Sequence, residues 1–213
     1  AQRNLDVKRF RKIKIKYPPL EEQQQIVKKL DATFAEIDKA IELQKRKIQN
    51  TIKILENHLS KLFSEDNKSW KKASLKEITT KIGSGATPKG GQSSYKNEGI
   101  SLIRSMNVHD LKMVRKNLAK IDDAQAAKLS NVSVKENDVL LNITGASVAR
   151  CALVDKDILP ARVNQHVSII RVIKESINPK LLSYMLVSKF YKDKLLAVGE
   201  GGGATRQAIT KKL

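Results

Sequence analysis

The side chains in this sequence that could act chemically are mainly arginines, amides and hydroxyls in polar segments. Arginine can donate two parallel hydrogen bonds to guanine, and the amides of asparagine and glutamine match the paired donor and acceptor of adenine. Fifteen residues of this kind, or of kinds that accompany them at base or phosphate contacts, stand in expected loops or at expected strand ends. For each one, a solvated surface role or a turn-forming role is the alternative. The candidates are Lys89, Gln92, Ser93, Tyr95, Arg104, Asn107, Thr144, Ser147, Arg150, Arg162, Asn164, Gln165, His166, Arg206 and Gln207.

Patterns typical of catalysis are absent from the sequence. The glycine-rich run at 199–203 lacks the spacing and the terminal Lys-Ser/Thr of a phosphate-binding loop. Cys151 and three scattered histidines make no zinc-ligand spacing. Asn178-Pro179-Lys180 differs from the motif that positions a base amine in amino-methyltransferases, and no compact acidic cluster with a lysine indicates a nuclease. We therefore expect a non-catalytic chain with no metal and no cofactor of its own.

The charge of the chain is strongly positive and unevenly distributed. The net charge is +19, and a field of that sign attracts polyanions, with nucleic acid as the first candidate. Residues 1–16 hold seven basic residues and one acid (+6), whereas residues 17–65 hold eight of each and are neutral. Residues 66–213 hold 26 basic and 13 acidic residues (+13). The polar candidates therefore lie in a segment that attracts nucleic acid.

The cellular setting is suggested by three features of the sequence. A single cysteine, Cys151, excludes an intramolecular disulfide and fits a reducing compartment. The chain starts with charged rather than apolar residues, and it has no apolar run long enough to cross a membrane. We expect a soluble cytoplasmic protein that does not contact a membrane.

Residues 20–63 repeat apolar side chains at the spacing of one long helix, which would span about 65 Å. From residue 44 onward, a strict heptad would place Gln44, Thr51 and His58 in the stripe. The apolar side chains instead stand one position later, as a straighter helix requires. Such polar positions can set register. We call the apolar stripe the seam; it consists of Val27, Leu30, Phe34, Ile37, Ile41, Ile48, Ile52, Leu55, Leu59 and Leu62.

The seam needs a partner, because a helix of this length with one apolar stripe is not stable alone. The sequence contains no second long helix of the same kind. We therefore expect the partner to be a second copy of the chain, which makes the protein a homodimer. The alternative is that the helix folds back onto its own globular domain.

The sequence divides into three expected pieces. Residues 1–16 form a basic tail in which the alternation at 13–16 predicts a short strand, and Tyr17-Pro18-Pro19 ends it. Residues 17–65 form the coiled-coil helix. Residues 66–213 form one α+β domain with a mixed or antiparallel sheet. Within this domain we expect strands at 101–104, 138–143 and 166–173, helices at 122–129 and 179–196, and loops at 83–91 and 199–203.

The segment from Tyr17 to Val27, YPPLEEQQQIV, resembles the start of a helix in the specificity subunits of type I restriction-modification systems. In that family a proline-led motif and a heptad run follow each target recognition domain. The first ten residues are also similar to the last ten, as if both ended such a domain. Further similarity lies in Trp70, Leu75, Gly85-Ala86-Thr87-Pro88, Tyr95, Gly99-Ile100, Asp138-Val139-Leu140, Thr144-Gly145-Ala146-Ser147 and the segment from Gly203 to Ile209.

The resemblance implies a role in reading double-stranded DNA. A full specificity subunit has two recognition domains joined by two antiparallel helices. Each domain reads half of a split target, and the helices set the gap and dock methyltransferase subunits that carry S-adenosylmethionine. A restriction subunit is a further possible partner. This chain departs from that pattern, because it has one long helix and one complete domain. Two copies would rebuild the arrangement and would read an interrupted palindrome.

Three other functions remain open from the sequence. The first is a regulatory nucleic-acid-binding protein with a coiled-coil dimer and no methyltransferase partner. The second is a fragment of an endonuclease or methyltransferase. The third is a structural coiled-coil adaptor, which would leave the charge of residues 66–213 unexplained.

Overall fold

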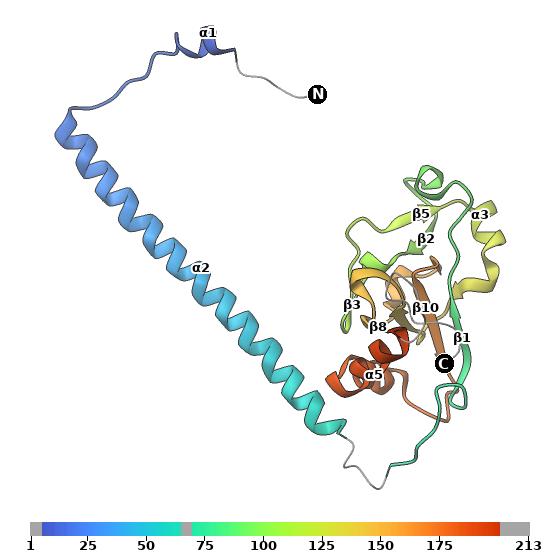
Figure 1. Ribbon diagram of the computed structural model, residues 1–213. Coiled ribbons are helices and arrows are strands. Elements are labelled where there is room, and N and C mark those ends of the chain that lie inside the picture. Colours follow the sequence, from blue (N-terminus) through green and yellow to red (C-terminus); the bar gives the residue numbers. More distant parts are fainter. Residues whose placement is uncertain (1–5, 65–69, 201–213) are drawn as a thin grey trace. The chain divides into compact units, whose positions relative to one another are not determined.

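A computed structural model of the chain describes residues 6–64 and 70–200 (Figure 1). The chain divides into two units, Ala1–Ile54 and Leu55–Leu213. The first unit contains a short helix, α1 (Val7–Phe10), and most of a long one, α2 (Leu20–Leu62). The second contains the end of α2 and all of the described strands.

Helix α2 confirms the expected long helix. It begins directly after the two prolines, and the side chain of Gln23 donates to the Pro18 carbonyl over 2.8 Å. Glu21 and Glu22 in the first turn complement the positive end of the helix dipole. Neither glycine nor proline interrupts its 43 residues. Nine seam residues are 46–60% exposed, and Leu59 alone is buried.

The segment before α2 differs from the prediction. Asp6 caps α1 by accepting a hydrogen bond from the amide of Lys8 over 2.9 Å. Residues 13–16 form no strand, and Ile13 and Ile15 are exposed. An alternating pattern becomes a strand only beside another strand, and none of the described strands pairs with this segment.

The second unit contains two four-stranded sheets and one hairpin. The first sheet has the order β1-β10-β7-β8 and is antiparallel. The second has the order β5-β2-β9-β6, in which β2 and β9 are parallel and the other pairs antiparallel. The strands are β1 (Thr79–Ser84), β2 (Ile100–Ile103), β3 (Val108–His109), β4 (Lys112–Met113), β5 (Ala119–Ile121), β6 (Ser133–Val134), β7 (Val139–Asn142), β8 (Cys151–Leu153), β9 (Ala161–Val163) and β10 (Val167–Val172).

The first sheet is covered on both faces. Leu140 and Ile169 belong to one core cluster, which they share with the second sheet and with α3 (Asp123–Lys128). Their neighbours Leu141 and Ile170 point the other way, into a cluster with α4 (Pro179–Val187) and α5 (Lys189–Glu200). Because strand side chains alternate between faces, a strand buried on both sides reads as a continuous apolar run. This arrangement confirms the expected α+β fold with mixed and antiparallel sheets.

The expected helix at 179–196 is two helices. Asn178 caps α4 by accepting from the amides of Lys180 and Leu181, and Pro179 takes the first helical position. Ser188 then adopts an extended backbone and separates α4 from α5. Helix α5 includes Gly199 and Glu200, which were expected in a loop, and residues 201–203 lie outside the described part.

Candidate nucleic-acid interface

Four loop segments meet at one edge of the two sheets: 85–87, 104–107, 143–147 and 164–166. We call them the loop edge. Strands β2 and β9 are parallel, so the segments that follow them emerge together, and the Asn164 amide donates to the Ile103 carbonyl over 3.0 Å. Strand β10 runs antiparallel to β1 and β7, so its start meets their ends. The Ile143 amide accordingly donates to the His166 carbonyl over 3.0 Å.

Gly85 allows segment 85–87 to pass close to the backbone at the end of β9. Its amide donates to Val167 O over 2.9 Å, and the amide of Ala86 donates to Val163 O over 3.0 Å. A Cβ atom on Gly85 would clash with the backbone carbonyls of Val163 and Asn164. Only glycine therefore permits this approach, which explains one residue of the Gly-Ala-Thr-Pro motif.

Two buried asparagines hold the backbone of the loop edge. The Nδ2 atom of Asn142 donates to the carbonyl of Ser105 over 2.9 Å and to the hydroxyl of Ser147 over 3.1 Å. Asn107 accepts from the amide of Arg104 over 3.1 Å and donates to the carbonyl of Val114 over 2.9 Å. Both asparagines are fully buried. Asn107, a candidate base reader by sequence, is therefore a structural residue in this conformation, with no exposed surface to offer a base.

Arg104 connects the loop edge to the expected glycine-rich loop. Its guanidinium lies 5.3 Å from the centre of the Tyr95 ring and donates to the carbonyl of Asn117 over 2.6 Å. The stacking and this hydrogen bond fix the plane of the guanidinium, and the side chain remains partly exposed. Arg104 Nε is buried and has no hydrogen-bond partner among the described residues, so only the terminal nitrogens of this guanidinium could reach a base or a phosphate.

A second polar group combines Thr144, Gln165 and His166. The Thr144 hydroxyl lies 2.6 Å from His166 Nδ1, and Gln165 Nε2 lies 3.2 Å from His166 Nε2. If Gln165 donates to Nε2, the ring proton is on Nδ1 and is donated to Thr144. The hydroxyl proton of Thr144 then remains available to an external acceptor. Gln165 is exposed, and the other two side chains are partly exposed.

The remaining candidates are more varied. Lys89, Gln92 and Ser93 are exposed around the short 3₁₀ turn at Gly91–Ser94, on the chain segment that leads to Tyr95. Ser147 and Arg150 lie on the turn between β7 and β8, and Asn164 is buried and accepts from the His166 amide. Arg162 is partly exposed, as Arg104 is, but its Nε donates to the Ala126 carbonyl of α3 over 3.1 Å. Arg206 and Gln207 lie outside the described residues.

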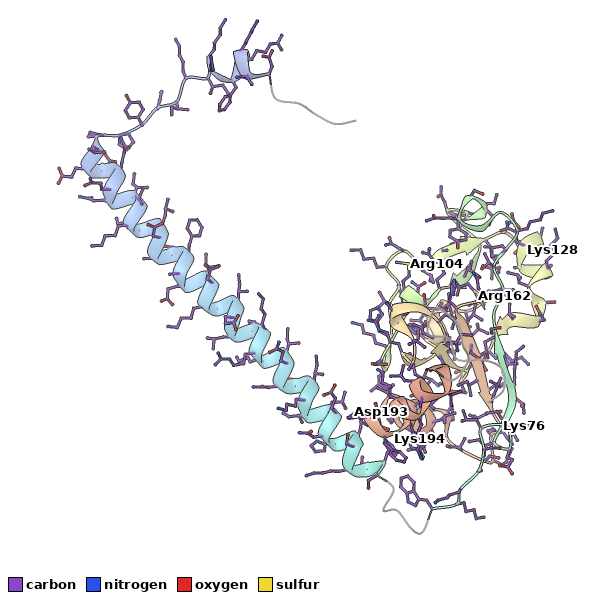
Figure 2. All side chains as sticks on the ribbon, in the orientation of Figure 1. Lys76, Arg104, Lys128, Arg162, Asp193 and Lys194 are labelled. Atoms are coloured by element: carbon purple, nitrogen blue, oxygen red, sulfur yellow. The ribbon has the colours of Figure 1, made fainter. Side chains whose placement is uncertain are left out.

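Figure 2 labels Arg104 and Arg162 on the second unit and places both well away from Lys194 on α5. Arg104 of the loop edge therefore lies away from Lys194 of α5. Met106 was not among the expected contacts, although it is 45% exposed within the loop edge. In the sequence, a methionine that follows an apolar strand is expected in the core. Only the structure therefore identifies Met106 as a possible contact with nucleic acid.

The side chains of the loop edge can donate and accept hydrogen bonds. Burial raises the pKa of the Cys151 thiol far above its ordinary value, and the nearby Asp110 carboxylate raises it further. The thiol is therefore held in its unreactive neutral form. Within residues 6–64 and 70–200, no three His, Cys, Asp or Glu side chains gather in a way that could hold a metal ion. No helix in this part of the chain is both long and apolar enough to cross a membrane.

Comparison with known proteins gives this geometry a context. A family model described as the type I restriction modification DNA specificity domain matches residues 1–53. The specificity subunit of the type I restriction enzyme MjaVIII from Methanocaldococcus jannaschii is 27% identical over 208 residues. The expected resemblance to type I specificity subunits is confirmed. That alignment covers 90% of this chain and 48% of the relative, so the chain spans about half the length of the specificity subunit it matches.

A solved structure also shares the fold of this chain. It comes from work on complex assembly and conformational transition of the type I R-M system. The similarity has a TM-score of 0.59 at 22% identity and covers 92% of this chain and 46% of the other. The subunit HsdS from Thermoanaerobacter tengcongensis aligns with 79% of the chain at 21% identity and a TM-score of 0.47.

Proposed function

We propose that this chain is a DNA-reading specificity module of a type I restriction-modification system. It binds double-stranded DNA through the loop edge and the neighbouring segment 89–95. The observation that carries this proposal is the convergence of Arg104, Thr144, Gln165 and His166 on one edge of a unit whose residues 66–213 carry a charge of +13. Base-edge contacts provide specificity, and the surrounding charge provides affinity for phosphates.

We further propose that the chain works as a homodimer of half-subunits. The exposed seam of α2 supports this, because nine apolar side chains in one stripe stay exposed along the helix. A twofold dimer with one recognition domain per copy would read an interrupted palindrome. The helices would also dock methyltransferase subunits, and in some assemblies a restriction subunit. S-adenosylmethionine would be bound by the methyltransferase, so this chain would contribute recognition and no catalysis.

Selection from a random double-stranded DNA library with the purified chain tests the reading function. The proposal expects one enriched motif made of two inverted half-sites with a fixed gap. Enrichment of no motif, with binding equal on all sequences, would contradict it. Sedimentation of the same protein at micromolar concentration tests the dimer, and a monomer would rule it out.

Two alternatives are separated by further measurements. Copurification of the chain with a methyltransferase subunit distinguishes a specificity module from a free-standing regulatory protein. Methylome sequencing of cells that express both would give the bases, the gap and the symmetry of the target. Cleavage or methylation of DNA by the chain alone, with magnesium or S-adenosylmethionine, would instead favour an enzyme.

A further inference from the structure

The seam of α2 has a change of phase near its middle. From Val27 to Ile41 the apolar residues follow one another at steps of three, four, three and four residues. From Ile48 to Leu62 the order is four, three, four and three. On a straight helix that turns about 100° per residue, all ten seam residues fall within an arc of about 100°. The stripe is therefore continuous, although its heptad phase shifts once.

This phase change makes the seam symmetric about the point between Gln44 and Lys45. Each seam residue on one side has a counterpart at the same distance on the other side. We infer that a second copy of the chain packs antiparallel on α2, with the twofold axis passing between Gln44 and Lys45. This register deepens the proposed homodimer and rests on it. The facing pairs are Val27 with Leu62, Leu30 with Leu59, Phe34 with Leu55, Ile37 with Ile52, and Ile41 with Ile48.

The phase change also disfavours other antiparallel registers. A strict heptad could slide by seven residues and still match itself, but this pattern cannot. With the axis at Ile41, Ile37 would face Lys45 of the second copy, and Leu59 would face Gln23. With the axis at Ile48, Ile52 would face Gln44, and the first two seam residues would have no counterpart in the helix. Only the axis between residues 44 and 45 gives every seam residue an apolar counterpart.

The polar residues at the axis suit a twofold pair. On a straight helix, Gln44 and Lys45 lie at the two borders of the seam. A twofold axis here brings Gln44 close to its own copy, and two primary amides can exchange hydrogen bonds because each carries a donor and an acceptor. On the other border the same axis brings Lys45 close to its own copy, and Glu42 of each helix lies on that side to offset the two positive charges. Polar side chains that meet their own copies in only one register help to fix that register.

Leu59 is the exception among the seam residues, because it is already buried within its own chain. The three innermost pairs do not depend on it. Phe34, Ile37, Ile41 and their counterparts are all exposed along α2. These six side chains are enough to define the register and are available to a second copy.

Disulfide trapping in the full-length chain tests the register. Cys151→Ala provides a background without the native thiol, and Ile41→Cys, Ile48→Cys and the double variant are made on it. In the inferred register, residue 41 faces residue 48 of the second copy, whereas residues 41 of the two copies are offset by about 10 Å along the helix. The double variant is therefore expected to give about tenfold more disulfide-linked dimer than either single variant, because a disulfide needs Cα atoms within about 7 Å. Leu43→Cys, on the opposite face, controls for random collision.

Other outcomes would overturn the register. Efficient crosslinking of Ile41→Cys alone indicates a parallel pair or an axis at Ile41, and crosslinking of Ile48→Cys alone indicates an axis at Ile48 or a parallel pair. No crosslink in any variant, from a protein that still sediments as a dimer, places the interface elsewhere. The DNA selection described above is run on the same background variant. An enriched motif without the expected crosslink would leave the reading function standing and would remove only the register.

Discussion

Arg104 and Arg162 have the same functional group but different surroundings. Arg104 is stacked on Tyr95 at the loop edge with part of its surface exposed. If it contacts a base, Arg104→Ala should weaken binding to the selected target by about 1–3 kcal/mol and relax the preference at one position. Fluorescence anisotropy with the target and with single-base variants measures both effects. Equal weakening on all sequences would make Arg104 a phosphate contact.

Arg162→Ala is the matched control. Arg162 is also partly exposed, but its guanidinium donates to the carbonyls of Ala126 and Ala161. Removal of these hydrogen bonds should lower the free energy of unfolding by about 1–3 kcal/mol. The folded fraction should keep the sequence preference of the original protein. A change of preferred base in this variant would instead return Arg162 to the group of DNA contacts.

Cys151 provides a chemical measure of the packing beneath the loop edge. The thiol is fully buried, and burial raises its pKa, so the reactive thiolate is scarce at neutral and mildly alkaline pH. Maleimide or iodoacetamide at pH 8 should therefore leave the native protein unmodified and should label it once after denaturation. Mass spectrometry distinguishes the two states. Rapid labelling of the native chain would mean that β8 opens readily.

Asp138 and Arg171 join the start of β7 to β10, and this pair should stabilise the first sheet. Asp138 is fully buried and receives two hydrogen bonds of 2.7 Å from the guanidinium and one of 2.7 Å from the Lys135 amide. Asp138→Ala leaves a largely buried cation and an amide without their acceptor. We expect a loss of about 3–5 kcal/mol in the free energy of unfolding. Urea denaturation followed by circular dichroism measures the loss.

Arg115→Ala tests whether burial is the cause of the large loss of stability expected for Asp138→Ala. Arg115 pairs with Asp155 and Asp157, but all three side chains are substantially exposed. The hydrogen bond from Arg115 holds the pKa of Asp155 below its ordinary value, yet water screens such a pair. The expected loss in the free energy of unfolding is therefore much smaller than that of Asp138→Ala. Equal losses in the two variants would mean that burial does not control the strength of these pairs.

Patterns that repeat along the chain could be predicted, and contacts between distant segments could not. The period of residues 20–63 predicted α2, and the apolar runs predicted β2, β7 and β10 to within one residue. Strands β3 and β6 have two residues each, which is too short for any alternation to be visible. The strand expected at 13–16 failed because the alternation there has no described partner strand.

For the candidate site, the sequence could predict that polar residues lie in loops, but it could not predict which of them are buried. Polar residues after strands indicated loops, and the parallel pairing of β2 and β9 brings several of those loops to one edge. Asn107 has the composition of a base reader, but its amide bonds to the carbonyls of Val114 and Lys116, which follow it in the chain. No local pattern distinguishes that role from an exposed one.

At the scale of the whole molecule, the proposed affinity for DNA depends on two recognition domains, one from each copy, joined through the seams of the two α2 helices. Ile41→Glu would place two carboxylates in the apolar interface near the twofold axis, and we expect it to give a monomer in sedimentation. Each monomer should still bind an isolated half-site as well as the original chain does. Binding to DNA with both half-sites should weaken by about a hundredfold to ten-thousandfold, because the second contact no longer benefits from a high effective concentration.

Leu43→Glu is the control for this change. Leu43 is equally apolar and 50% exposed, but it lies on the face of α2 opposite the seam. It should remain a dimer and keep its affinity for the two-site DNA. Loss of half-site binding by Ile41→Glu would indicate that the helix affects the reading domain directly, because the added charge lies on α2 and not in the loop edge. Full two-site affinity in a monomeric Ile41→Glu protein would contradict the dimer as the source of affinity, since one loop edge would then be sufficient.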